Sequence, residues 1–167
     1  MAYETWAKED VKLWGDVSVA KIKGILENIP LTKNAESTCK ILKRKGYLLA
    51  VISTGLNFVI ERLKNECSID YAVCNELSED KSGLSVKVNV SLDKKPKEKV
   101  LENLLSNLRM ERENTIAVGD TDDEAEMMKA ASFSVLFNPD PNESDLARKY
   151  ASVVVESKDL KDILPYL

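Results

Sequence analysis

The sequence contains no histidine among its 167 residues. Serine–histidine triads, histidine general bases and histidine-bound zinc all need an imidazole, so each of them is excluded. Cysteine is scarce as well: Cys39, Cys67 and Cys74 form no Cys-x-x-Cys pair, and an odd number of cysteines suits buried, free thiols. These scarcities exclude histidine chemistry and favour a reducing compartment.

Long hydrophobic runs are also missing. No apolar stretch approaches the roughly 20 residues that a membrane span needs, and the first ten residues lack the basic-then-apolar layout of a signal peptide. The net charge is −4, whereas binding along a phosphate backbone favours a basic surface. We therefore expect a cytoplasmic, single-domain protein without membrane or nucleic acid among its partners.

The apolar pattern predicts an alternation of helices and strands. Helical spacing on either side of Gly15 and Asp16 predicts two helices before Pro30, and a third helix is predicted over residues 32–45. After it, short apolar runs predict strands at 47–52, 71–73, 115–118, 134–137 and 152–155, and helices at 57–67, 97–108 and 123–131. Residues 84–90 alternate after a turn at 80–83, which predicts a hairpin arm. Strands alternating with helices indicate a parallel, Rossmann-like sheet.

Residues 116–124 place an apolar segment directly before a Gly-Asp turn. Gly119 permits a tight exit from the predicted strand, and four carboxylates follow at a predicted helix start: Asp120, Asp122, Asp123 and Glu124. Carboxylate oxygens at the carboxyl end of a parallel strand suit a hard cation such as Mg2+. The alternative is an ordinary acidic helix start, which the helix macrodipole favours.

Two other polar segments lie at predicted strand or helix ends. Ser53, Thr54 and Gly55 offer hydroxyls and backbone N–H groups that suit a phosphate oxygen, although helix capping explains the same residues. Lys97 opens a helix after Pro96 and could neutralise an anion, although it also belongs to a lysine-rich segment typical of a solvated surface. Hydroxyls, a cation and carboxylates are the groups that hold a phosphoryl group beside Mg2+.

In order and context, these segments resemble the motifs of the haloacid dehalogenase superfamily of phosphatases, and most closely its phosphoserine phosphatase-like branch. The resemblance rests on residues 50–55, which end in Ser-Thr-Gly, on Lys97, and on residues 118–124, which read Val-Gly-Asp-Thr-Asp-Asp-Glu. It implies an α/β fold with a Rossmann-like three-layer α/β/α sandwich. The implied domains are a partial helical cap over 1–31 and a core over 32–167, with a β-hairpin insertion near 76–92.

The resemblance also implies a Mg2+-dependent hydrolase of a small phosphorylated metabolite. It implies a phosphate site that includes the catalytic residues Ser53 and Lys97 and comprises Ser53, Thr54, Gly55 and Lys97, and a metal site formed by Asp120, Asp123 and Glu124. One departure concerns the substrate, because residues 6–11 contain no arginine where the family's cap arginine holds the carboxylate of phosphoserine. That departure disfavours phosphoserine.

A larger departure concerns the nucleophile. The family's first motif, a strand ending in Asp-x-Asp-x-Thr, supplies the attacking aspartate and does not occur in this sequence. The nearest imitation, residues 135–140, has Asn138 in place of the nucleophile and is interpreted as a loop. We therefore expect little or no turnover from this chain alone. The alternatives are a non-catalytic, phosphate- or metal-binding regulatory protein and, less favoured by the order of its motifs, a receiver-like signalling domain.

The strand that carries the first motif lies centrally in the family's sheet, between the strands predicted here at 47–52 and 116–118. Because neighbouring strands lie about 4.8 Å apart, its absence leaves a gap of nearly two strand spacings. Unpaired edges of this kind bind other strands. We expect direct pairing of the two strands, a strand borrowed from a second copy in a homo-oligomer, or a truncated form of a longer product.

Overall fold

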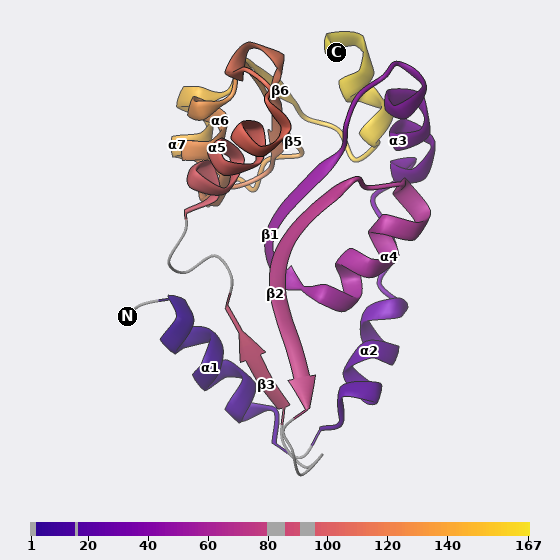
Figure 1. Ribbon diagram of the computed structural model, residues 1–167, viewed down its shortest axis with the longest axis vertical. Coiled ribbons are helices and arrows are strands. Elements are labelled where there is room, and N and C mark those ends of the chain that lie inside the picture. Colours follow the sequence, from indigo (N-terminus) through magenta and orange to yellow (C-terminus); the bar gives the residue numbers. More distant parts are fainter. Residues whose placement is uncertain (1–2, 16, 80–85, 91–95) are drawn as a thin grey trace. The chain divides into compact units, whose positions relative to one another are not determined.

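The computed structural model describes residues 3–15, 17–79, 86–90 and 96–167. The chain separates into two compact units (Figure 1). The first unit comprises residues 1–30 and 39–96, and the second comprises 31–38 and 97–167. The cap over 1–31 and the core over 32–167 stay a prediction. No helix in the described ranges is long and apolar enough to cross a membrane.

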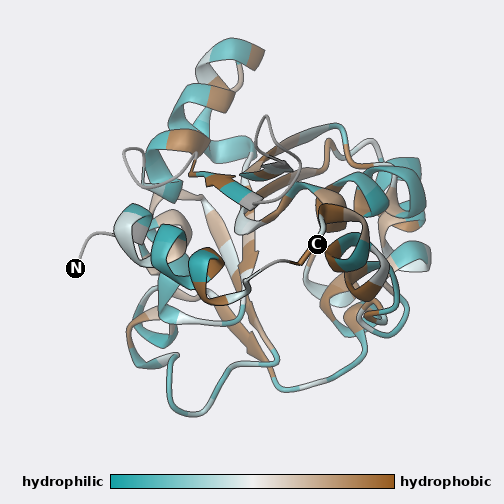
Figure 2. Cartoon of the chain, turned by 90° about the horizontal axis from the view of Figure 1, so that it is seen from below, coloured by the Kyte–Doolittle hydropathy of each residue, from teal (hydrophilic) through white to brown (hydrophobic). Residues whose placement is uncertain are grey.

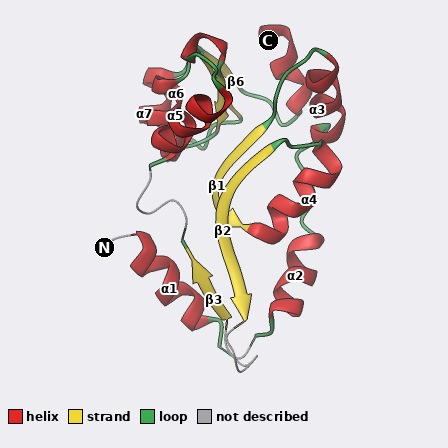
Figure 3. Ribbon diagram, viewed as in Figure 1, coloured by secondary structure: helices red, strands yellow, loops and turns green. Residues whose placement is uncertain are grey.

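The first unit is built on a mixed three-stranded sheet (Figure 3). Its strands have the order β1-β2-β3, with β1 parallel to β2 and β2 antiparallel to β3. Its elements are α1 (Tyr3–Leu13), α2 (Val19–Glu27), most of α3 (Ala35–Arg44), β1 (Ala50–Leu56), α4 (Asn57–Cys67), β2 (Tyr71–Glu79) and β3 (Val86–Asn89). The two predicted N-terminal helices and the helix predicted over 57–67 are confirmed.

Apolar faces of helices and strands form the core of this unit. Its buried cluster joins Val11 of α1, Ile22 of α2, Leu77 of β2 and Val88 of β3. Leu77 and Val88 are paired across the hairpin, and their exposed neighbours Lys87 and Asn89 complete the alternation that the sequence predicts. The predicted turn at 80–83 and residue Asp16 lie outside the described residues.

The strand β1 differs from its prediction. The sequence predicts a strand ending at Ile52 followed by a turn, whereas β1 continues to Leu56 and includes Ser53, Thr54 and Gly55. The register with β2 shifts between Ile52 and Leu56, and the Gly55 N–H donates to Ser53 Oγ at 2.9 Å. The turn at Ser53 therefore lies inside β1, because β1 pairs with β2 again at Leu56, beyond the irregularity.

The second unit is a parallel sheet with the order β4-β5-β6. Its elements are α5 (Lys97–Leu108), β4 (Ile116–Gly119), α6 (Ala125–Ala130), β5 (Phe133–Phe137), α7 (Asp145–Tyr150) and β6 (Val153–Val155), with 3-10 turns at Arg112–Asn114, Asp122–Glu124 and Leu160–Tyr166. Helices connect its parallel strands, which confirms the predicted α/β class. The carboxyl ends of all three strands lie at one edge.

The helices carry both hydrophilic and hydrophobic residues, as expected of helices that bury one face and expose the other (Figure 2). The core of the second unit contains Val135, Phe137, Val155 and Ile163. Val135 is fully buried, as is typical of a parallel strand covered on both faces. This packing fixes the strand ends from which the candidate site is built.

β1 and β4 correspond to the two strands between which the family's first-motif strand is expected. Within the described residues, β1 pairs only with β2 and β4 pairs only with β5. These pairings are those of each unit by itself, and the expected direct pairing of β1 with β4 stays a prediction. In β4, Val118 is 39% exposed although it lies in the middle of an apolar strand.

Candidate functional site

The site begins at the Gly-Asp turn after β4. Gly119 has no room for a side chain, because a Cβ atom there would lie 2.5 Å from Cγ and 2.7 Å from Cβ of Glu124. The missing side chain lets the first turn of the following helix fold back over the strand end. Gly119 therefore places the carboxylate of Glu124 beside the carboxyl end of the sheet.

Glu124 is held by two sets of contacts. Its Oε1 forms an ion pair with Nζ of Lys97, and the two side chains are only 13% and 11% exposed. Its Oε2 accepts hydrogen bonds from the backbone N–H of Thr121 at 3.2 Å and from the Thr121 hydroxyl at 3.0 Å. The predicted phosphate lysine and one predicted metal ligand are therefore brought together, with the carboxylate already neutralised.

Asp120 lies close to this pair. Burial of its carboxyl raises the pKa of Asp120 above its usual value, the charges of Glu124 and Asp140 raise it further, and Lys97 partly offsets them. Burial and the neighbouring carboxylate make the ionised form of such a carboxyl unfavourable, and a bound cation would stabilise that form. Asp120 and Glu124 are thus the two predicted metal ligands whose charges interact.

The other two carboxylates of the turn behave differently. Asp122 Oδ1 accepts a hydrogen bond at 2.8 Å from the N–H of Ala147 in α7, and the Asp122 N–H donates to Glu143 O at 2.6 Å. Asp123 is exposed. Asp122 therefore secures the loop that follows β5, whereas Asp123 projects into solvent.

The donor set fits a metal that needs few protein ligands. Within the described part of the chain, no group of three or more aspartate, glutamate or cysteine side chains is arranged to hold an ion. Mg2+ commonly takes only one or two protein carboxylates and completes its octahedron with water and phosphate oxygens. Asp120 and Glu124 satisfy that smaller requirement.

A pocket of about 420 Å³ opens at the carboxyl ends of β4 and β5. All of its lining residues belong to the second unit: Thr32, Val118, Gly119, Asp120, Phe137, Asn138 and Lys158. The sequence arguments predict only Gly119 and Asp120 beside this space. Asn138 directly follows β5 and Lys158 closely follows β6, so position after a parallel strand is the signal that finds both.

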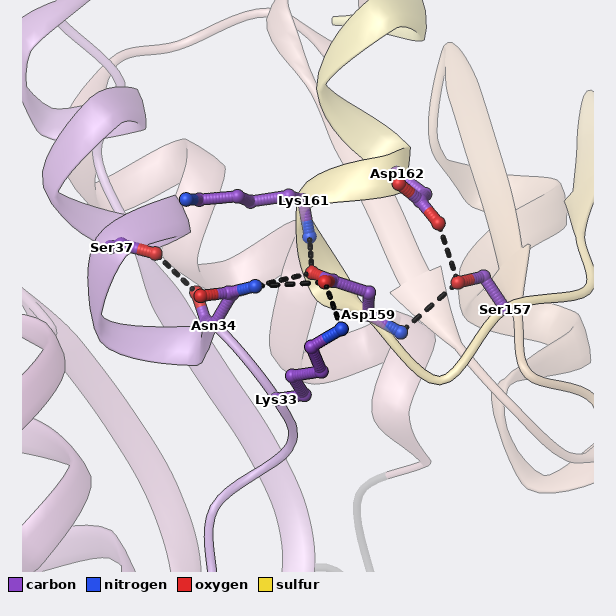
Figure 4. Close-up of polar contacts among 7 residues, drawn as sticks. All are labelled: Lys33, Asn34, Ser37, Ser157, Asp159, Lys161 and Asp162. Carbon is purple, nitrogen blue, oxygen red and sulfur yellow. Dashed lines mark hydrogen bonds and ion pairs between the residues drawn. The ribbon is translucent and has the colours of Figure 1, made fainter.

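A polar cluster holds two sides of this pocket in place (Figure 4). Asn34 Nδ2 donates to both carboxylate oxygens of Asp159 at 2.9 and 2.8 Å, and Lys33 Nζ lies 3.0 Å from Oδ2. The Leu160 N–H also donates to Lys33 O at 3.0 Å. This Asp159 clamp, formed by Lys33, Asn34 and Asp159, ties segments 125 residues apart, and the lining residues Thr32 and Lys158 immediately flank it.

The clamp predicts a pH-dependent stability. Hydrogen bonds from Asn34 and Lys33 lower the pKa of Asp159 to about 2 from the ordinary 3.8. A lowered carboxyl pKa stabilises the fold fully above the unfolded value, and this stabilisation is lost as pH falls from about 3.8 to about 2. In urea unfolding, Asp159→Asn should therefore be less stable than the wild type at pH 7, with the difference shrinking below pH 4. A difference that stays constant down to pH 3 would contradict this, and Asp145→Asn, outside the clamp, serves as control.

The predicted phosphate residues of β1 belong to the first unit. Ser53 Oγ accepts the Gly55 N–H, and the Thr54 carbonyl accepts a hydrogen bond from Nδ2 of Asn75 at 2.7 Å. Asn75, only 1% exposed on β2, thus fixes the backbone of the β1 irregularity. The expectation that Ser53, Thr54 and Gly55 act together with Lys97 stays a prediction.

Known proteins resemble the chain over most of its length. A family model for haloacid dehalogenase-like hydrolases matches residues 2–132. A phosphoserine phosphatase from Methanocaldococcus jannaschii is 30% identical over 166 residues, which cover 99% of this chain and 77% of that protein. One from Archaeoglobus fulgidus is 31% identical over 132 residues, which cover 78% of this chain and 38% of that protein.

Solved structures agree with these matches. The structure described as a phospho-aspartyl intermediate analogue of phosphoserine phosphatase superposes with a TM-score of 0.87 at 28% identity and covers 100% of this chain and 78% of that chain. The fold class and the family expected from the motifs are confirmed. The chain therefore belongs to the haloacid dehalogenase-like hydrolases, in the phosphoserine phosphatase-like branch of that family.

Proposed function

We propose that the chain carries the metal- and phosphate-binding part of a Mg2+-dependent phosphomonoester hydrolase. The observation that carries the proposal is the arrangement of Lys97, Glu124 and Asp120 at the carboxyl end of β4, beside a pocket large enough for a small phosphorylated metabolite. Its chemical class agrees with the phosphoserine phosphatases among its relatives. Phosphoserine itself is not favoured as substrate, because residues 6–11 contain no arginine.

The proposed roles follow from charge. Asp120 and Glu124 hold Mg2+, with Asp123 as a further outer ligand, and the bound ion neutralises negative charge on phosphoryl oxygens. Lys97, released from part of its pairing with Glu124, balances the anion from the α5 side. Ser53, Thr54 and Gly55 bind a phosphoryl oxygen through the serine hydroxyl and backbone N–H groups.

The attacking group is the part that this sequence does not supply. One solved relative is described as a phospho-aspartyl intermediate analogue of phosphoserine phosphatase, which names an aspartate as the phosphorylated residue of the intermediate in that protein. No Asp-x-Asp-x-Thr occurs in the present sequence, and we expect weak turnover at most. Loss of the nucleophile typically removes most of the catalysis beyond what binding and electrostatic stabilisation supply.

Hydrolysis of an aryl phosphate tests this function. The wild type should show weak hydrolysis that requires Mg2+, and Asp120→Ala should remove it because the remaining ligand is already neutralised by Lys97. Glu126→Ala is the matched control, since it deletes an exposed carboxylate of the same helical segment. Retained hydrolysis in Asp120→Ala would contradict the assigned metal role.

The second candidate is a regulatory protein that binds metal and phosphate without turnover. The engaged state of Lys97 favours it, because the cation is already paired with Glu124. Phosphate binding without any Mg2+-dependent hydrolysis would support this candidate. Hydrolysis that is lost in Asp120→Ala and kept in Glu126→Ala would rule it out.

The remaining expectations belong to this proposal. The thiols of Cys39, Cys67 and Cys74, none of them in a disulfide among the described residues, support a reducing, cytoplasmic setting. The expected homo-oligomer with strand complementation from a second copy belongs to the same proposal, because an unpaired strand edge binds other strands. A partial helical cap over residues 1–31 and a core over residues 32–167 also belong to this proposal.

A further inference from the structure

The pocket beside β4 contains a cation that the motifs do not assign. Lys97 is engaged by Glu124 in a contact with little solvent exposure. Lys158 also lines the pocket and, within the described ranges of the chain, it has no ion pair and no side-chain hydrogen bond. Of these two lysines, Lys158 is therefore the one that lines the pocket and is not engaged by a carboxylate among the described residues.

Neutral donors accompany this lysine. The hydroxyl of Thr32 and the amide of Asn138 line the same pocket, and neither side chain has a hydrogen-bond partner among the residues that the structure describes. Asn138 has a positive φ of 46°, and its backbone N–H donates to Val155 O at 2.9 Å, so its position is fixed by the sheet. An ammonium, a hydroxyl and an amide are together the donors that an oxyanion requires.

These donors come from three segments that the fold holds together. Thr32 and Lys158 flank the Asp159 clamp, in which Asn34 and Lys33 bind the carboxylate of Asp159. The clamp engages the carboxylate of Asp159, which follows Lys158 in the sequence, and no ion pair between Asp159 and Lys158 occurs among the described residues. The clamp also limits the freedom of the two backbones on either side, which lowers the entropy lost when a ligand is bound.

We infer that Lys158, with Thr32 and Asn138, forms an oxyanion subsite of this pocket for the phosphate class of ligand. The choice of phosphate rests on the proposed function, whereas the subsite rests on the donors themselves. Asp120 lies on the same pocket and repels an anion until a cation neutralises it. Phosphate should therefore bind more tightly in the presence of Mg2+.

Calorimetric titration of the full chain with inorganic phosphate, with and without Mg2+, tests the subsite. Lys158→Gln should weaken phosphate binding about tenfold or more, which corresponds to losing a charge-assisted hydrogen bond. Thr32→Val should weaken it by a smaller factor. Lys161→Gln is the matched control, because this exposed lysine lies outside the pocket and contacts Asp159 only through its backbone N–H.

Three results would overturn the inference: no phosphate binding by the wild type, equal affinity in Lys158→Gln, or acetate binding as tightly as phosphate. The last result would replace a phosphate subsite with a carboxylate subsite. Aryl phosphate hydrolysis, measured on the same variants, separates this inference from the proposed function. Mg2+-dependent hydrolysis together with phosphate binding that Lys158→Gln leaves unchanged overturns the subsite and leaves the function standing, whereas Lys158-dependent binding without hydrolysis keeps the subsite and fails the function.

Discussion

Replacing Lys97 by methionine is expected to destabilise the second unit by about 3 kcal/mol, near the lower end of the range for breaking a buried ion pair. The substitution keeps the length and apolar volume of the side chain but leaves the carboxylate of Glu124, only 13% exposed, without its cation. Two hydrogen bonds from Thr121 remain and cannot supply the missing charge. The loss thus comes from an uncompensated anion rather than from lost packing.

The measurement needs a probe of the second unit. Both tryptophans, Trp6 and Trp14, belong to the first unit, so fluorescence does not report on the other one. Hydrogen exchange of peptides covering residues 97–137 in increasing urea follows the unit directly. In Lys97→Met, these peptides should lose their protection from exchange at a lower urea concentration than in the wild type.

Two matched variants decide the cause. Lys99→Met deletes a lysine of the same helix whose partner, Glu102, is exposed, and exposed pairs contribute only about 0–1 kcal/mol. The double variant Lys97→Met with Glu124→Gln removes the stranded charge and should recover part of the loss. Equal effects of Lys97→Met and Lys99→Met would contradict the role assigned to the pair.

Local chemistry accounts for much of what the sequence predicts. The helix predicted over 97–108 has the same bounds in the structure, because Pro96 precedes it and apolar residues then recur at helical spacing. The apolar run 134–137, which predicts β5 one residue short of its start, and the Gly-Asp exit after β4 are equally local signals. Such signals are sufficient to predict that Asp120 and Glu124 follow the end of a strand.

What the sequence misses depends on distant contacts. The serine turn at residues 53–55 is a valid local prediction, but pairing with β2 places it inside a strand. Lys158 has only its place after a predicted strand as a signal, and the contact that holds its segment beside Thr32 is the one between Asp159 and Asn34, 125 residues apart. The six-residue helix α7, Asp145–Tyr150, lacks a long periodic pattern, and it is held by a hydrogen bond from Ala147 to Asp122.

These differences bear on the chemistry of the site. The local motif gathers four carboxylates, three of which the resemblance implies as metal ligands, but the structure separates them by their partners. Asp122 supports the backbone of α7, Asp123 is exposed, and Glu124 is paired with Lys97. Of these four carboxylates, Asp120 alone lines the pocket, which explains why the proposed assay relies on that residue.

Replacing Gly119 by alanine should have the second large effect. The new Cβ would meet Glu124 Cγ at 2.5 Å and Cβ at 2.7 Å, and Met128 Cε at 3.0 Å. Neither neighbour can move freely, since Glu124 is bound by Lys97 and Thr121, and Met128 is 2% exposed. Overpacking of this kind costs about 1–3 kcal/mol, and any relief that turns Glu124 away also weakens its ion pair.

The same substitution elsewhere in the chain provides the control. Gly24 lies inside α2, and a Cβ there would have no heavy atom within 4 Å. Because glycine is unfavourable in a helix interior, Gly24→Ala should stabilise the first unit by roughly 0.5–1 kcal/mol. Gly119→Ala should instead speed hydrogen exchange at residues 116–128 and abolish Mg2+-dependent phosphate binding, because its clash displaces Glu124. An alanine at 119 that leaves both measurements unchanged would mean that the turn after β4 can open without cost, and the geometry assigned to Asp120 and Glu124 would then be wrong.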